Sequence, residues 1–330
     1  MDWGSIIDNS VTAMFGLEAV VFALAAVGLN MHFGYTGLLN FGQVGFMAVG
    51  AYGAAVTVNY YDLSLWAGVV ASLVLALVLA LLLGLPTLRL RADYLAIVTI
   101  AAGEIIRLIA RSVEFEEITG GSSGLSRFAQ AFYDLNPYGN GTYGLWFVKF
   151  DERRAWVLTV GWLLVILLSV LVFLLIRSPW GRVLKAIRED EDAARSLGKN
   201  VYSYKMQSLV LGGIIGAFGG LLLAIGTQSV QPDSYSTPVT FFAYTALILG
   251  GTARIGGPIL GSMLFWGLLA LTDNLLRQAI SADYIPTWLM DSTQVGQVRF
   301  MLVGVGLAVL MVFRPQGIFG DRREIALDAR

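Results

Sequence analysis

Long apolar stretches separated by short polar ones repeat along almost the whole chain. Nine of them meet or approach the roughly 20 residues that a helix needs to cross a bilayer. They lie at about 11–32, 41–60, 64–86, 93–112, 156–176, 206–227, 239–253, 257–276 and 298–313. The third and fifth are continuous aliphatic runs, whereas the second, seventh and eighth are shorter and rich in glycine. The pattern predicts an all-α fold, a polytopic transmembrane helical bundle of about nine spans with glycine-interrupted helices.

The composition favours a membrane protein and excludes several kinds of chemistry. Hydrophobic residues make up 56% of the 330 positions and charged residues 14%, and the mean hydropathy is +0.70. Soluble domains carry about 25% charged residues. The apolar composition makes membrane lipid the expected partner. A formal net charge of -1 gives no field that attracts nucleic acid, so nucleic acid is not expected as a partner. The chain has no cysteine, and its one histidine, His32, is expected at the membrane edge, so no metal or cofactor is predicted.

Lysine and arginine are distributed unequally between the polar stretches. One side would hold Arg89, Arg91, the seven basic residues between 177 and 205, Arg254, Arg314, Arg322, Arg323 and Arg330. The other would hold Arg127, Lys149, Arg153, Arg154, Arg277 and Arg299, with Arg107 and Arg111 at the end of a span. Because basic residues are retained in the cytoplasm, we expect an outside N-terminus and a cytoplasmic C-terminus in the cell (plasma or inner) membrane.

This orientation gives residues 1–330 the form of one transmembrane domain with two notable polar segments. Residues 113–155 would lie outside the cell, and their length indicates a functional or partly helical segment rather than a plain connector. Residues 177–205 would lie inside and hold an unusual number of charges for a membrane chain. The two segments therefore mark opposite ends of the predicted bundle.

The inner segment has the signals of one cytoplasmic helix or two short ones. Ser178 can cap a helix, Pro179 suits its first turn, and Gly198 suits the left-handed position that ends one. Four apolar residues at helical spacing would share one face, namely Val183, Ile187, Ala194 and Leu197. From this pattern alone the segment is either a solvated helix on the lipid headgroups or a docking element for a soluble partner.

Few polar residues lie inside the apolar stretches, and these are candidates for a substrate pathway. Asn40 and Gln43 fall in the glycine-rich run from 34 to 53, whose glycines permit close helix packing or a break that exposes backbone amides. Glu104 and Arg107 are three residues apart and are expected to form a structural ion pair, whereas Glu18 is given no role.

Glycine also recurs in the second half of the chain. The glycines at 212, 216 and 220 form a ridge typical of helix packing. A second interrupted segment runs from 250 to 261. Two broken segments in the two halves are the pattern of transporter folds built on an internal inverted repeat.

Several motifs together resemble a known family. Asp192-Ala193-Ala194, followed three residues later by Gly198, resembles the Glu-Ala-Ala-x-x-x-Gly loop by which ABC importer permeases contact their ATPases, with Asp in place of Glu. Other stretches resemble the LivM-like branch of the branched-chain amino acid permeases. They are GYTGLLNFGQVGFMAVGAYGAA (34–55), LRLRADYLAIVTIAAGEIIRLI (88–109), ITGGSSGL (118–125), LGGTARIGGPILGS (249–262) and FRPQGIFG (313–320). The matches run in order from about residue 16 to residue 320.

The resemblance implies a non-catalytic permease subunit of an ABC importer for branched-chain or other apolar amino acids. Its partners would be two ATPase subunits, a homologous permease subunit in a heterodimer, and an extracytoplasmic solute-binding protein. ATP would be hydrolysed on the ATPases, because this chain has no Walker A loop. Relatives that carry urea or short amides are an alternative, and so is a stand-alone secondary transporter or channel.

The resemblance also points to two sets of site residues. The expected ATPase-coupling residues are Arg188, Glu189, Asp190, Asp192, Ala193, Ala194 and Gly198. The expected translocation-pathway residues are Asn40, Gly42, Gln43, Gly45, Gly120, Gly121, Ser122 and Ser123.

Overall fold

Gly16 divides the first apolar stretch into two helices, α1 (Trp3–Phe15) and α2 (Leu17–Leu29). The computed structural model describes residues 2–88, 92–145, 148–282, 284, 290–291, 293–314 and 316–320. Asp2 caps α1 by accepting a hydrogen bond from the Ser5 amide at 3.2 Å, and α1 packs on α13. The first span therefore begins at Leu17, and the predicted start at residue 11 was wrong because a separate helix precedes it.

Each of the other predicted stretches coincides with a helix. These are α3 (Gln43–Asn59), α4 (Leu65–Thr87), α5 (Ala92–Arg111), α8 (Glu152–Arg177), α11 (Val201–Thr227), α12 (Thr237–Gly250), α13 (Gly257–Ser281) and α14 (Val295–Phe313). Helix α2 continues into a π-helix, η1 (Asn30–Tyr35). Within the described ranges, six helices are long and apolar enough to cross a membrane by themselves, whereas α3 and α12 have only 17 and 14 residues. The expected number of nine spans is therefore approximate.

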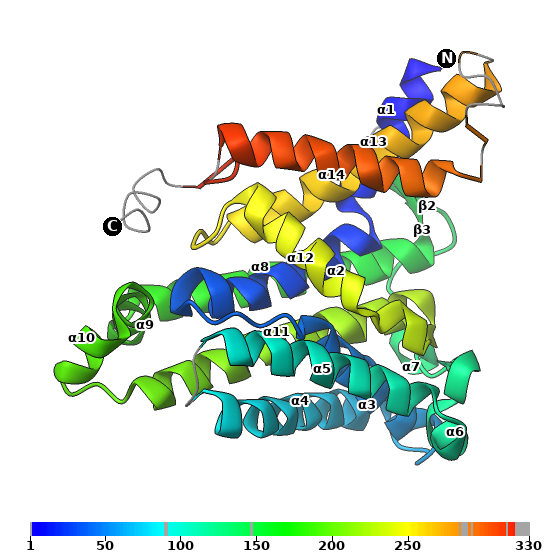
Figure 1. Cartoon of the computed structure of the whole chain (residues 1–330). Helices are drawn as coiled ribbons and strands as arrows, with labels where there is room; N and C mark the ends of the chain where they lie inside the picture. Colours follow the sequence, from blue (N-terminus) through cyan, green and yellow to red (C-terminus); the bar gives the residue numbers. More distant parts are fainter. Residues whose placement is uncertain are drawn as a thin grey trace.

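The short elements gather at the two ends of the bundle (Figure 1). One end carries α9 (Pro179–Glu189) and α10 (Glu191–Ser196). The opposite end carries η2 (Val113–Phe115), α6 (Glu116–Thr119), η3 (Gly121–Ser123), β1 (Leu125–Ser126), α7 (Gln130–Tyr133), β2 (Thr142–Leu145), β3 (Val148–Asp151), β4 (Ser229–Val230) and η4 (Pro232–Tyr235). The segment expected at 113–155 is thus partly helical, with a β2–β3 hairpin in addition.

Helices α2, α3 and α11 form the centre of the bundle. Almost every residue of α2 is buried, which explains why its sequence is apolar on all sides. The glycine ridge of α11 lies against α2 and α3, because a Cβ at Gly212 would lie 2.5 Å from the Gly28 carbonyl oxygen, and one at Gly220 would lie 1.9 Å from that of Met47. The predicted packing role of this ridge is confirmed. Helices α4 and α8 lie outside this centre and expose many of their leucines.

Replacing Gly220 with alanine tests this packing. The new methyl group would overlap the Met47 backbone, so we expect Gly220→Ala to lower the free energy of unfolding by about 1–3 kcal/mol. The measurement is thermal unfolding of the detergent-purified protein. At Gly306 on α14 a Cβ would meet no atom within 4 Å, so Gly306→Ala should leave the Tm unchanged. Equal Tm values for both variants and the parent would contradict the packing argument.

Candidate functional site

The polar segment after α8 folds into two short helices rather than one. Pro179 begins α9 as predicted, but the Ser178 hydroxyl donates to the Leu175 carbonyl at 2.6 Å and does not cap α9. Asp190 separates the helices with an extended backbone. Its carboxylate accepts from the amides of Asp192 and Ala193 at 3.0 and 2.9 Å, and so caps α10. Sequence reasoning proposed Asp190 as a contact for a partner, whereas the structure gives it this local role.

The inner side of this helix pair packs against the bundle. Ile187 and Ala194 are buried with Val201 at the start of α11, as their helical spacing predicted. Glu191 fixes α10 further, because it pairs with Lys205 of α11 and with Arg195 at 2.9 Å. Leu197 does not join this face, and its predicted place there was wrong, because α10 has already ended at Ser196.

The outer side of the pair forms an exposed surface, the docking surface, made of Asp192, Ala193, Leu197 and Gly198. The Asp192 side chain is 89% exposed and pairs with Arg195 at 3.1 Å, and Leu197 is 79% exposed. Gly198 has a left-handed φ of 75° and completes a Schellman motif, in which its amide donates to Arg195 and the next amide to Ala194. The motif residues thus face outward except for Ala194.

Arg188 turns the other way and joins α9 to the π-helix. Its Nη1 donates to the Gly34 carbonyl at 2.5 Å, and its side chain lies against Gly37, where a Cβ would come within 3.4 Å of the Arg188 Cγ. Glu189 is exposed. Among the predicted coupling residues, Arg188 therefore contacts residues 34–37, whereas Ala194 packs on the start of α11.

A buried polar network lies directly beyond this contact. His32 lies near the end of the span Leu17–Tyr35 and is fully enclosed by the protein. The Asn40 amide donates to His32 Nδ1 at 3.0 Å and to Gln43 Oε1 at 3.1 Å. His32 Nδ1 then accepts, so Nε2 carries the proton and donates to the Leu209 carbonyl at 3.1 Å. The Gln43 amide donates to the Gly212 carbonyl at 3.1 Å, which ties the network to α11.

Asn30 links the same region to a third part of the chain. Its side chain donates to the Arg254 carbonyl and accepts from the Ala253 amide, both at 2.9 Å. Arg254 itself lies in the second glycine-rich segment. Residues 30–43 therefore contact α9, α11 and the loop between α12 and α13.

The predicted pathway residues separate into two groups at different levels of the bundle. Asn40 and Gln43 are fully enclosed, and Gly42 and Gly45 allow α5 to approach, since a Cβ at Gly42 would lie 2.1 Å from the Thr99 carbonyl oxygen. The second group lies at the end opposite α9. There the glycines at 120 and 121 have positive φ values, and the serines at 122 and 123 are exposed.

An ion-pair cluster holds α5 to η4 at that opposite end. Arg107 pairs with Glu104 at 2.5 Å, which confirms the predicted pair, and with Asp233 at 2.8 Å. Arg111 pairs with Asp233 at 3.1 Å. Sequence reasoning missed Asp233, because its partners lie more than a hundred positions away and only the fold brings them together.

Two tyrosines at this end are held in the neutral form. Burial raises the pKa of Tyr133 and of Tyr235, so both hydroxyls stay protonated and act as donors. Tyr133 donates to the Ile225 carbonyl at 2.9 Å, and Tyr235 to that of Gly220 at 3.3 Å. Both bonds fix the outer segments to the end of α11.

Long apolar helices around a buried polar network, with an exposed helix pair at one end, define a polytopic membrane permease. A family model described as the permease component of branched-chain amino acid transport systems matches residues 12–292, and the chain belongs to this family. It is a permease subunit of an ABC importer, a class that works together with ATPase and substrate-binding components.

Individual relatives cover most of the chain. The chain is 32% identical over 309 residues to the high-affinity branched-chain amino acid permease LivM of Salmonella typhimurium, and 31% identical to that of Escherichia coli K12. Each alignment covers 91% of this chain and 68% of the relative. The L-arabinose permease AraH of E. coli K12 is 31% identical over 236 residues, which cover 70% of this chain and 65% of AraH.

Replacing Asn40 with leucine tests the buried network. The variant leaves His32 Nδ1 and Gln43 Oε1 without the donor they now share, so we expect a loss of about 1–3 kcal/mol in the free energy of unfolding. Thermal unfolding in detergent measures it. Asn140→Leu, at an exposed position opposite α9, is the control and should leave the Tm unchanged. An unchanged Tm for Asn40→Leu would show that the network contributes no stability.

Proposed function

We propose that this permease carries branched-chain or other apolar amino acids, and that its docking surface binds one of two ATPase subunits. The observation that supports the docking role is that the helix pair has one side buried against the bundle and one side exposed. Ile187 and Ala194 fix it to the bundle, while Asp192, Ala193 and Leu197 face outward beside Gly198. An exposed leucine at the end of a capped helix that also carries an exposed aspartate is the kind of surface that a protein partner covers.

The end that carries α9 and α10 is proposed to be cytoplasmic. Exposed basic residues gather there, at Arg177, Arg182, Lys185, Arg195 and Lys199. Arg153 and Arg154 of the opposite end argue against this orientation in the sequence, but they lie beside acidic residues, with Arg154 3.5 Å from Asp151. The arginines at 89, 91, 322, 323 and 330, which entered the same prediction, lie outside the described residues. The N-terminus would then lie outside the cell.

The opposite end is proposed to receive the solute-binding protein, and a homologous permease subunit is proposed to complete the pathway. Residues 113–155 and 227–238 form one continuous surface there, because β1 pairs with β4 through Leu125 and Val230. The pairs of Asp233 with Arg107 and Arg111 link the second of these segments to α5. The serines at 122 and 123 are exposed on this surface, where an arriving substrate could reach them.

Coupling is proposed to run through Arg188 into residues 30–43. Movement of the ATPases would displace α9, and the hydrogen bond from Arg188 to Gly34 would carry that displacement to the π-helix. Asn40 and Gln43 are enclosed in the present arrangement, so a shift of this segment is needed before either can face a pathway. Such a switch requires that the network also have a second discrete arrangement.

Neighbouring alanines provide a matched test of the docking surface. Ala193 is exposed and Ala194 is buried, so Ala193→Arg should keep the parent Tm, whereas Ala194→Arg should lower it. We expect Ala193→Arg to abolish co-purification of the ATPase and ATP-driven uptake of labelled leucine by the reconstituted complex. Normal ATPase binding by Ala193→Arg would overturn the docking role. Uptake of urea or short amides but not leucine by the parent complex would overturn the proposed substrate class and leave the docking role intact.

Arg188→Met tests the coupling route. The variant keeps the aliphatic contact with Gly37 but removes the hydrogen bond to Gly34. We expect the ATPase to co-purify as before, while leucine uptake per bound ATPase falls about tenfold, the scale of a lost coupling energy. Arg182→Met, at an exposed position on the same helix, is the control and should retain uptake. Equal uptake by both variants would place the coupling elsewhere.

A further inference from the structure

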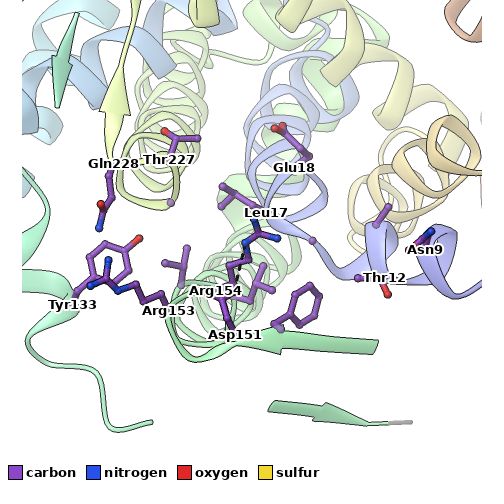
Figure 2. Close-up of a pocket in the computed structure, with 16 residues that line it drawn as sticks. Asn9, Thr12, Leu17, Glu18, Tyr133, Asp151, Arg153, Arg154, Thr227 and Gln228 are labelled. Carbon is purple, nitrogen blue, oxygen red and sulfur yellow. Dashed lines mark ion pairs between the residues drawn. The ribbon is translucent and has the colours of Figure 1, made fainter. Parts of the chain in front are cut away.

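A polar cavity lies at the end of the bundle opposite α9 and α10. Its volume is about 810 Å³, and its walls come from the ends of α1, α2, α7, β3, α8 and α11. Figure 2 shows Arg154 in the middle of the lining, with Tyr133, Arg153 and Gln228 on one side and Asn9 and Thr12 on the other. The cavity lies apart from the docking surface, the buried network and the ion pairs of Arg107.

Charges of both signs face this cavity. Arg153 and Arg154 come from the first turn of α8, Glu18 from the first turn of α2, and Asp151 from the end of β3. Arg154 has one long contact with Asp151, at 3.5 Å, and the Arg153 guanidinium lies 5.8 Å from the centre of the Tyr133 ring. In the part of the chain that the structure describes, the Glu18 carboxylate has neither a hydrogen bond nor an ion pair.

An unpaired carboxylate in a membrane helix is costly unless it faces water or a cationic partner. The Glu18 side chain is exposed and lines the cavity, so a ligand ammonium group there can reach its carboxylate directly. The carbonyl end of α11 at residues 226–228 adds partial negative charge beside it. The two guanidinium groups offer N–H donors that suit a carboxylate or a phosphate. The cavity thus presents sites for one cation and one anion together.

We propose that this cavity binds a small zwitterion, with its ammonium group on Glu18 and its anionic group on Arg153 and Arg154. Two sources share this chemistry, a free α-amino acid and the headgroup of a phosphatidylethanolamine lipid. The proposal does not depend on the transported substrate. Its tests measure binding to the purified complex rather than uptake, so its failure is distinguishable from failure of the proposed function.

Calorimetry on the purified complex with matched probes tests the zwitterion requirement. L-Leucine carries both charges, leucinamide only the ammonium, and 4-methylpentanoate only the carboxylate. Glycerophosphoethanolamine and glycerophosphate form the corresponding lipid-headgroup pair. We expect one zwitterion to bind at least about tenfold more tightly than its single-charge analogues, since each loses one charge-assisted contact. Tight binding of leucine identifies an amino-acid site, and tight binding of glycerophosphoethanolamine a lipid site. The absence of any zwitterion preference overturns the proposal.

Substitutions of the lining residues test whether that binding takes place in the cavity. Glu18→Gln should weaken the preferred zwitterion at least about tenfold and bring it to the affinity of the probe that lacks the ammonium group. Arg154→Gln, at an exposed side chain, should bring it toward the affinity of the probe that lacks the anionic group, and it provides the test if Glu18→Gln fails to fold. Glu114→Gln, an exposed carboxylate on η2, is the control and should bind as the parent does. Parent-like binding by either folded cavity variant overturns the assignment.

Discussion

The structure depends on satisfying the backbone of residues 38–42, which links η1 to α3 without helical hydrogen bonds. Such a segment survives at membrane depth only if protein groups replace water as its partners. Thr99 accepts from the Phe41 amide at 3.1 Å, Asn40 from the Gly42 amide at 2.9 Å, and Thr240 from the Val44 amide at 3.0 Å. Thr99 comes from α5 and Thr240 from α12, so these two helices are fixed in place by the same bonds that permit the break. The buried His32 network adds α11 to this set.

The sequence predicted the helices well and their side-chain environments less well. Long apolar runs have few alternatives to spanning helices, so the positions of α4, α8 and α11 followed directly from composition. The break at Gly16 was missed, because the hydropathy of a stretch does not show where one helix ends and the next begins. The burial of His32 was missed for a related reason. Its partners Asn40 and Leu209 come from other parts of the chain, and no local sequence pattern indicates these contacts.

The candidate docking surface shows a similar division. Pro179, Ile187, Ala194 and Gly198 took the positions that helix geometry predicted, because caps and helical spacing are local properties. Ser178 did not cap α9, because its hydroxyl bonds the Leu175 carbonyl, and Leu197 did not join the buried face, because α10 ends at Ser196. The sequence left open whether this segment forms one helix or two, and the structure has two, with Asp190 as the N-cap of the second. The direction of Arg188, into the bundle rather than toward a partner, required the fold itself.

The break at Asp190 has a consequence for how such permeases diversify. Helix α10 is capped by its own preceding aspartate and held by Glu191, so its fold draws little on the residues that face outward. Exposed positions on it can therefore change while the bundle keeps its packing. On the proposed docking role, a permease with this construction could acquire or lose a particular ATPase by surface substitution alone, and could share one ATPase with other permeases whose membrane helices differ. Which ATPase the permease uses would then be decided by residues outside the membrane helices.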